Sequence, residues 1–316
     1  MNNKGLNIAK NDKMDEFYTR YVEVENELCH YAKFFVGKTI YCNCDDYRVS
    51  NFYKYLKNNF KTFGLRKLIA SCYKKRSLLD LNNDERAFYV EYDGIDTNVT
   101  YFNGDGDFRS MECIRLLEQC DIVITNPPFS MFREFVRFMI QYNKLFLAIG
   151  NVNAVTTKEL FQHIKNGNIR LGVTIRGGGC LFGVPNEYGT YEGACGKTTE
   201  CGKTIRVRGV RWFTNLKHGY EPEMLNTGKQ YEVSVYPKYD NFDAINIDKT
   251  EDIPLDYDGL MGVPVTFIDK YNSNQFELIG HEHDLNGNGG EGVAGGQFIV
   301  NGKCVYKRIL IRKITK

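Results

Sequence analysis

The tetrapeptide Asn126-Pro127-Pro128-Phe129 combines residue types that can hold a planar amine beside an electrophile. The lone pair of such an amine, for example the exocyclic N6 amine of adenine, is delocalised into its ring, so the amine must be oriented before it can attack. The side-chain oxygen of Asn126 and the carbonyl of Pro127 can accept its two N–H groups, and the prolines turn that carbonyl outward. Phe129 can stack on the base. The motif therefore predicts methyl transfer to an amine by positioning and charge stabilisation.

The position of the motif separates this chemistry from a purely structural role. The motif follows the apolar run 121–125 and precedes a helical pattern, where two prolines can also serve as a rigid turn that starts a helix. Ligands of open parallel sheets bind outside the carboxyl ends of the strands, which favours the functional interpretation. No proline of the sequence is followed by cysteine, which argues against a cysteine nucleophile acting on cytosine C5 and favours direct attack by an amine.

Alternating helix and strand patterns lie around the motif. Apolar residues recur at helical spacing in four segments, 21–35, 50–63, 111–119 and 132–142. Short apolar runs between them predict strands over 39–44, 65–72, 86–92, 122–125 and 144–150. This alternation predicts an α/β fold with a mainly parallel sheet and helices on both faces.

The second half of the chain has a different pattern. After about Leu171, short apolar runs are separated by glycines, as in 206–213, 231–236, 263–268 and 306–311. These runs predict a smaller, mainly β region with an irregular connector over 183–203. The length of 316 residues allows two such parts, and we expect the division near residue 172.

Composition narrows the class of protein. Hydrophobic residues make up 42% of the chain and charged residues 25%, as in an ordinary globular protein. Residues 1–15 are polar and no later run approaches the length of a membrane span, so we expect a cytoplasmic protein without a membrane partner. Ten cysteines with no export signal and no Cys-X-X-Cys spacing predict reduced thiols. A calcium loop beginning at Asp284 would need a carboxylate where Gly295 stands, so we expect a polar surface loop and no metal.

Basic residues are concentrated in two blocks, although the net charge is only +2. The block 197–217 contains a single glutamate, the block 303–316 contains no acid, and the segment 240–258 between them is strongly acidic. Solvated surface is the simplest interpretation of each residue alone. Together, the two blocks in one half of the chain can form a patch that follows phosphates.

The order of these motifs resembles a known family. Phe17-Tyr18-Thr19, the acidic strand end Asp45-Asp46, Gly106-Asp107-Phe108 and the Asn-Pro-Pro-Phe motif succeed one another as in methyltransferases that act on the amine of adenine. Within that group the chain is most similar to the EcoRI-type adenine-specific methyltransferases. The similarity extends over nearly the whole chain and includes the later segments 210–216, 256–264 and 306–312.

The resemblance implies a class I, Rossmann-like methyltransferase domain over 1–172, which binds S-adenosylmethionine, and a target-recognition region over 173–316. The residues that it places around the cofactor are Phe17, Tyr18, Thr19, Asp45, Asp46, Phe52, Asp107 and Phe108. The first three would border the methionine end. An aspartate at 45 or 46 would hold the amino group or the ribose, and Asp107 would accept from the adenine amine, with Phe108 against the ring.

Local alternatives exist for several of these residues. Thr19 can instead cap an ordinary helix, and Asp107 can be a turn aspartate in a glycine-rich loop. The glycine-rich cofactor loop common in such enzymes is absent, and the segment 44–52, in which Ser50 is expected to cap a helix, takes its place. The glycines 177–179 lack the Lys-Ser/Thr ending of a phosphate loop and predict a tight turn.

The resemblance also implies the substrate. It is double-stranded DNA, with the target adenine flipped out and methylated at N6 without a metal or a covalent enzyme intermediate, in a restriction-modification system or alone. A cognate restriction endonuclease would act on the same site without a stable complex. The side chains expected to reach phosphates or guanine edges are Arg176, Arg206, Arg208, Arg211, Lys307 and Arg308. Two alternatives remain. The substrate can instead be an RNA adenine or a protein glutamine amide, or the chain can be a DNA-binding relative without catalysis.

Overall fold

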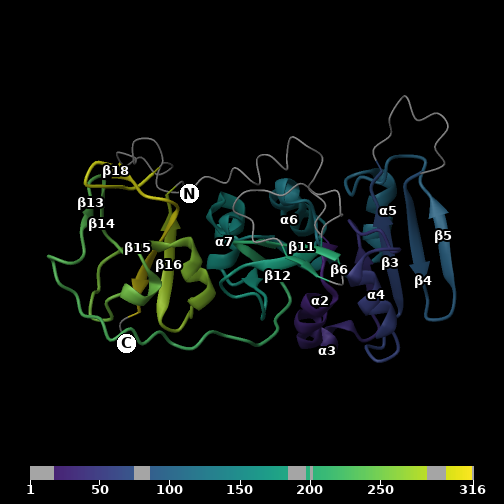
Figure 1. Cartoon of the computed structure of the whole chain (residues 1–316), viewed down its shortest axis with the longest axis horizontal. Helices are drawn as coiled ribbons and strands as arrows, with labels where there is room; N and C mark the ends of the chain where they lie inside the picture. The colour runs from purple at the N-terminus through teal and green to yellow at the C-terminus, as the bar shows by residue number, and fades with distance from the viewer. Residues whose placement is uncertain (1–17, 75–85, 184–196, 200–201, 283–296, 315–316) are drawn as a thin grey trace. The chain divides into compact units, whose positions relative to one another are not determined.

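The structure, a computed structural model, describes residues 18–74, 86–183, 197–199, 202–282 and 297–314. The chain divides into two compact units, unit 1 with residues 1–150 and 172–218 and unit 2 with residues 151–171 and 219–316 (Figure 1). The chain thus leaves unit 1 after Gly150 and re-enters it at Gly172, so a single division at 172/173 does not separate the compact units. The assignment of catalysis to 1–172 and of recognition to 173–316 stays a prediction.

Unit 1 contains helices, 3-10 turns and two sheets. Its helical segments are α2 (Tyr21–Leu28), η1 (Cys29–Tyr31), α3 (Ala32–Phe35), α4 (Asn51–Asn58), α5 (Met111–Gln119), η2 (Phe129–Met131) and α6 (Phe132–Gln141). Its strands are β1 (Tyr18–Thr19), β2 (Thr39–Cys42), β3 (Lys67–Cys72), β4 (Phe88–Tyr92), β5 (Thr97–Tyr101), β6 (Ile122–Thr125), β7 (Leu145–Asn151), β9 (Cys180–Gly183), β10 (Lys197–Thr199), β11 (Gly202–Val207) and β12 (Val210–Thr214).

The large sheet is mixed, and those of its strands that belong to unit 1 follow the order β5-β4-β3-β2-β6-β7-β12. The central strands β3, β2, β6 and β7 are parallel, with Ile40 opposite both Leu68 and Ile122. At one edge β4 runs antiparallel to β3, and β5 antiparallel to β4. The predicted α/β fold is therefore confirmed, while the expectation of a mainly parallel sheet holds for the centre only. The short turn between β4 and β5 allows only an antiparallel pair there.

Helices cover both faces of this sheet. Side chains of a strand alternate between its faces, and Leu147 of β7 lies in one core cluster with Leu28 of α2 and Leu56 of α4. The neighbouring Phe146 points to the opposite face, where its ring meets Phe135 of α6 with centroids 6.1 Å apart. Burial of apolar side chains on both faces explains why the central strands have few polar residues.

A smaller sheet of unit 1 has the order β1-β9-β11-β10. Its strand β1 pairs antiparallel with β9, with Tyr18 opposite Gly183 and Thr19 opposite Phe182. The start of the described chain therefore belongs to a strand, and the N-cap of α2 is Arg20, which makes no side-chain capping bond. The alternative in which Thr19 caps a helix is wrong.

Unit 2 contains one α-helix and mainly short strands in its described residues. Its five-stranded sheet has the order β13-β14-β15-β19-β16, and a separate hairpin pairs β17 with β18. Its elements are η3 (Val152–Thr156), α7 (Lys158–Lys165), β8 (Arg170–Leu171), β13 (Lys238–Tyr239), β14 (Phe242–Asn246), η4 (Thr250–Asp252), β15 (Met261–Pro264), η5 (Val265–Lys270), β16 (Phe276–His281), β17 (Ile299–Val300), β18 (Lys303–Cys304) and β19 (Arg308–Lys313).

The structure also corrects several predicted elements. The helix expected over 21–35 is interrupted by the 3-10 turn η1, and the strand expected over 206–213 is divided by a turn at which Gly209 has a φ of +76°. The run 231–236 forms turns rather than a strand, and 263–268 is half strand and half 3-10 helix. Among the described residues, no helix has the length and apolar character needed to cross a membrane.

Candidate active site

The Asn-Pro-Pro-Phe motif forms the turn predicted for it. It follows the last residue of β6, a fully buried strand, and leads through η2 into α6. The side-chain oxygen of Asn126 and the ring of Pro127 are buried, whereas Pro128 and Phe129 are half-buried. The Phe129 ring stands edge-on to Phe182 of β9, with centroids 6.2 Å apart. The turn thus lies at the carboxyl end of a central strand, where open α/β sheets bind ligands.

A buried aspartate holds the start of this turn. Asp45 is 8% exposed, and its two carboxylate oxygens accept from the hydroxyls of Ser50 and Thr125, each at 2.7 Å. The backbone N–H of Asn126 also donates to this carboxylate. Burial raises the pKa of Asp45 from 3.8 to about 6, although these hydrogen bonds oppose the rise. Asp45 therefore connects the loop after β2, the end of β6 and the first residue of the motif.

The same network begins the helix after β2. The Ser50 hydroxyl, which donates to Asp45, accepts from the backbone N–H of Tyr53 at 3.3 Å and caps α4 as predicted. The backbone N–H of Asp45 donates to the carbonyl of Ser71 in β3 at 2.9 Å. The carboxyl ends of three neighbouring strands are therefore tied together through one residue. Thr125 is the last residue of the otherwise apolar strand β6. Its polar side chain was a sequence signal for the contact with Asp45, which the sequence interpretation missed.

Two buried polar atoms beside this network lack hydrogen-bond partners among the described residues, the hydroxyl of Thr19 and the side-chain oxygen of Asn43. Thr19 is 4% exposed and Asn43 is 3% exposed. The side-chain amide of Asn51, the first residue of α4, donates to the backbone carbonyl of Thr19 at 2.8 Å, so β1 lies beside this helix start. A buried polar atom without a partner is costly, and a polar ligand at this place would satisfy it.

The two other predicted cofactor carboxylates contact arginines. Burial raises the pKa of Asp46, but hydrogen bonds from Arg48 and the charge of Lys74 outweigh it and leave the pKa below its usual range. The hydrogen bonds from Arg109 hold the pKa of Asp107 below its usual range as well. Asp107 also accepts from the backbone N–H of Arg109 at 2.9 Å, which is the contact of a turn aspartate.

The aromatic residues predicted for the cofactor lie inside unit 1. Phe52 is 2% exposed and stands edge-on to Trp212, with centroids 5.7 Å apart. Phe108 is 6% exposed and meets Phe138 of α6 at 5.7 Å. Both rings therefore contribute to the core. Tyr18 is half-buried in β1, and Phe17 lies outside the described residues.

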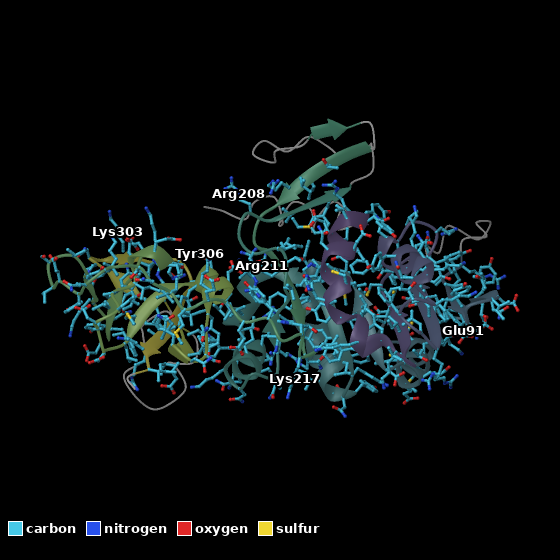
Figure 2. All side chains as sticks on the ribbon, turned by 90° about the horizontal axis from the view of Figure 1, so that it is seen from below. Glu91, Arg208, Arg211, Lys217, Lys303 and Tyr306 are labelled. Carbon is cyan, nitrogen blue, oxygen red and sulfur yellow. The ribbon has the colours of Figure 1, made fainter. Side chains whose placement is uncertain are left out.

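The basic residues predicted to contact DNA differ in exposure. Arg206 and Arg208 are exposed, and Figure 2 shows Arg208 at the turn between β11 and β12. Arg176 is half-buried and donates to the carbonyl of Gly172 at 2.6 Å. Lys307 of unit 2 is half-buried as well.

Two further predicted DNA contacts are buried. Arg211 is 2% exposed and donates to the carbonyl of Val210 at 2.6 Å within unit 1. Arg308 is 8% exposed and pairs with Asp248 at 3.1 Å within unit 2. A buried guanidinium must be hydrogen-bonded internally to offset its desolvation, so these two arginines already use their donors to stabilise the fold.

Other sequence features take structural roles. Gly177, Gly178 and Gly179 all have positive φ, and a side chain at Gly179 would collide with the backbone of Val207, so this segment is the tight turn that was predicted. His281 is buried at the end of β16, and residues 283–284, where the expected polar loop begins, lie outside the described part. The described residues contain no cluster of three or more His, Cys, Asp or Glu side chains placed to hold a metal.

Comparison with known proteins identifies the family of the chain. The model of the family described as adenine-specific methyltransferase EcoRI matches residues 5–314. The chain is 47% identical to the type II methyltransferase M.EcoRI of Escherichia coli over 322 aligned positions, which cover 98% of the chain and 96% of that protein.

Two mycoplasma proteins are also similar. The type II methyltransferase M.MgeORF184P of Mycoplasma genitalium is 40% identical over 278 positions, covering 87% of the chain and 85% of that protein. The type II methyltransferase M.MpnI of Mycoplasma pneumoniae is 37% identical over 278 positions, covering 87% of the chain and 84% of that protein. No solved structure matches the chain.

Proposed function

Because the chain belongs to the EcoRI family of adenine-specific methyltransferases, and is therefore a type II DNA methyltransferase that modifies adenine, we propose that the turn 126–129 holds the target amine during transfer. The observation that supports this proposal is the placement of the turn at the carboxyl end of β6, with Asp45 fixing the backbone of Asn126. A rigid acceptor pair at this position is what an amine of low nucleophilicity needs.

In the proposed reaction, the Asn126 side-chain oxygen and the Pro127 carbonyl accept the two N–H groups of adenine N6, and Phe129 lies against the flipped base. S-adenosylmethionine, when bound, supplies a methyl group on a positively charged sulfur. With it bound, the turn would hold the N6 lone pair toward that methyl, so that an N–C bond could form as the S–C bond broke. S-adenosylhomocysteine would leave, and one N6 proton would pass to solvent. The two oxygens stabilise the positive charge that develops on the amine.

Residues after the carboxyl end of β2, together with Thr19 of β1, fit a methyl donor of this kind. The hydroxyl of Thr19 and the side-chain oxygen of Asn43 are buried polar atoms whose hydrogen-bonding capacity no described residue uses. The Thr19 hydroxyl can donate to the carboxyl group or accept from the amino group of a methionine moiety, and the Asn43 oxygen can accept from its amino group. Asp46 and Asp107, both ionised because their pKa values are low, are proposed to face the cofactor as well. Both carboxylate oxygens of Asp45 accept hydrogen bonds, from Ser50 and Thr125, and we therefore assign Asp45 a positioning role.

The finer fold and recognition assignments are part of the proposal. The mixed sheet with helices on both faces supports a class I, Rossmann-like methyltransferase fold for unit 1. Arg176, Arg206, Arg208 and Lys307 retain the exposure that a DNA contact requires, whereas the buried Arg211 and Arg308 do not. A cognate restriction endonuclease that reads the same site without a stable complex is the functional counterpart that we propose.

The test is transfer of labelled methyl from S-adenosylmethionine to mixed-sequence duplex DNA, followed by nucleoside analysis. We expect N6-methyladenine, and we expect activity to fall with added salt because phosphate contacts release counterions. Parallel reactions with RNA and with protein extract examine the other amine substrates. Preferred labelling of RNA or protein in that competition would contradict the proposal.

A further inference from the structure

A small hollow on unit 1 is lined by cationic and aromatic side chains outside the predicted DNA-binding region. Its volume is about 100 Å³. The residues that line it, here called the basic hollow, are Tyr47, Arg48, Lys74, Arg86, Phe88, Val99 and Tyr101. None of them is among the six basic residues that sequence reasoning assigned to DNA, all of which lie beyond residue 172.

Aromatic rings hold the two guanidinium groups of the hollow. The Arg48 guanidinium lies 4.9 Å from the centre of the Phe88 ring, and that of Arg86 lies 5.0 Å from the centre of Tyr101. Tyr47 packs edge-on against Phe88, with centroids 5.6 Å apart. Stacking on aromatic faces orders an arginine in advance, so less side-chain entropy is lost when the guanidinium binds an anion.

The charge of the hollow is positive among the described residues. Arg48, Lys74 and Arg86 supply three cations. The nearby carboxylate of Asp46 accepts from Arg48 at 2.5 Å and is further stabilised by the charge of Lys74. Arginine and lysine side chains in this lining can be shared between that carboxylate and an anionic group.

The size of the hollow limits that anion to a single group. Sites for drug-sized ligands and cofactors have volumes of about 300 to 1,000 Å³, whereas this hollow has about 100 Å³. Arginine forks match the oxygens of a phosphate, and a lysine adds a point charge. The lining therefore fits one phosphate rather than a whole nucleotide or the methyl donor.

The residues of the hollow lie on the same side of the sheet as the catalytic turn, at the carboxyl ends of its parallel strands. Arg48 follows the carboxyl end of β2, Lys74 follows that of β3, and Asn126 follows that of β6, all of which are parallel strands. Phe88 begins β4 opposite Cys72, the last residue of β3. From β6 to β4 the sheet has three inter-strand spacings, about 14 Å, which is the rise of about four base pairs.

We propose that the basic hollow binds a backbone phosphate of the substrate duplex, within a few base pairs of the methylated adenine. This inference rests on the proposed function, because the adenine held at Asn126 brings the flanking phosphates to this edge. The contact is independent of base sequence and sets the register of the duplex against the catalytic turn. It adds a DNA contact within residues 47–101, whereas the predicted recognition region comprises residues 173–316.

The test measures binding of a labelled mixed-sequence duplex to the full chain as a function of salt concentration. For Arg86→Ala we expect weaker binding and a slope of log K against log salt that is reduced by about 0.9, the value for one lost phosphate contact. Arg86→Lys should keep the slope, because the charge remains. Arg66→Ala is the matched control, because Arg66 is an exposed arginine at the opposite edge of the same sheet and pairs with Asp121 at 3.1 Å. An unchanged slope for Arg86→Ala, or an equal reduction for Arg66→Ala, would overturn the proposal.

Two further arms separate the sources of failure. Methyl transfer by the native chain on the same duplex establishes the proposed function by itself, so a native chain that methylates DNA while Arg86→Ala keeps the native slope refutes only the hollow. The hollow would be a site for free anions if millimolar inorganic phosphate raised the melting temperature of the native chain while Arg86→Ala left DNA binding unchanged. That result would also overturn the proposal. Unchanged melting of Arg86→Ala shows that the variant is folded.

Discussion

The parallel strands of the large sheet have polar residues at both of their ends, and these residues have different roles. We call the side where β2, β3 and β6 begin the amino edge, and the side where they end the carboxyl edge. At the amino edge, Asp121 accepts from the backbone N–H of Thr39 at 2.8 Å and pairs with Arg66 at 3.1 Å and Lys38 at 3.6 Å. Lys67 of β3 pairs there with Glu91 of β4 at 2.9 Å. These ion pairs hold strand ends together.

At the carboxyl edge Asp46 and Asp107 also pair with arginines, but other buried polar groups differ. Asn43 at this edge and Thr19 of strand β1 beside it keep buried polar atoms that no described residue satisfies. Asp45 is buried although its ionised form is costly there. The difference between the edges teaches that buried polar atoms with spare hydrogen-bonding capacity, rather than ion pairs, distinguish a ligand site. The following substitutions test that rule.

The largest effect is expected for Asn126→Ala. Loss of one of two acceptors for the amine should lower kcat by about 100- to 1,000-fold, as loss of a preorganised stabilising group does in other enzymes. Steady-state methyl transfer to duplex DNA is the measurement, with Asn58→Ala on the exposed side of α4 as the control that keeps native activity. Equal activity of the two variants would remove the motif from catalysis.

The next effect is expected for Asp45→Asn. Its amide cannot accept at both former oxygens, so one buried donor loses its partner and kcat should fall by about 10- to 100-fold. In the native enzyme kcat should rise with pH through about 6, the pKa to which burial raises Asp45. The variant should lack this step, whereas Asp46→Asn should retain it because the pKa of Asp46 is low.

The groups near Asp45 do not interfere with this profile. Burial raises the pKa of the Cys42 and Cys44 thiols well above the usual value, so both stay neutral around pH 6. Stability should change in the opposite direction to kcat. The folded pKa of Asp45 exceeds its ordinary value of 3.8, so its contribution to stability is present below about pH 4 and is lost as the pH rises through about 6. A melting temperature and a kcat that rise together across this range would contradict the positioning role.

A smaller effect is expected for Thr19→Val. Removal of the hydroxyl should raise the KM for S-adenosylmethionine by up to about tenfold, the value of one hydrogen bond, without lowering the melting temperature. Thr39→Val is matched in size and burial but lies at the amino edge, where its hydroxyl accepts from Arg66 at 3.1 Å. It should lower the melting temperature and leave KM unchanged. The reverse result would break the distinction between the edges.

The smallest functional effect is expected for Asp121→Asn. The substitution removes partly exposed ion pairs and should cost about 1 kcal/mol, because screened pairs contribute little. Thermal unfolding should shift down by a few degrees, while kcat and both KM values stay native. A clear loss of kcat would mean that the amino edge also serves catalysis.

Local patterns predicted the parts of the site that depend on neighbours in sequence. The strand 122–125, the turn after it and the cap by Ser50 could be predicted because each requires only a short run of residue types. The internal role of Asp45 could not, because it depends on the packing of Ser50 and Thr125 around it. A row of acids at a strand end predicts a polar edge but not which carboxylate turns inward.

Basic residues illustrate the same limit. Arg208 and Arg211 are separated by two residues, yet one is exposed at a turn and the other is buried in β12. Charge alone therefore predicted DNA contacts in the second half and overlooked the hollow around Arg86. The cations of that hollow are distant in sequence, and only the pairing of β3, β4 and β5 brings them together.

The division of the chain has a consequence for engineering new specificities. The strands β9 to β12, within residues 172–218, complete the sheets of unit 1, while the earlier segment 151–171 belongs to unit 2. A chimaera joined at one point near residue 172 would therefore take Trp212 from one parent and its neighbour Phe52 from the other. Transplanting unit 2 between relatives calls for three junctions, after residues 150, 171 and 218, with the intervening strands inherited from the catalytic parent.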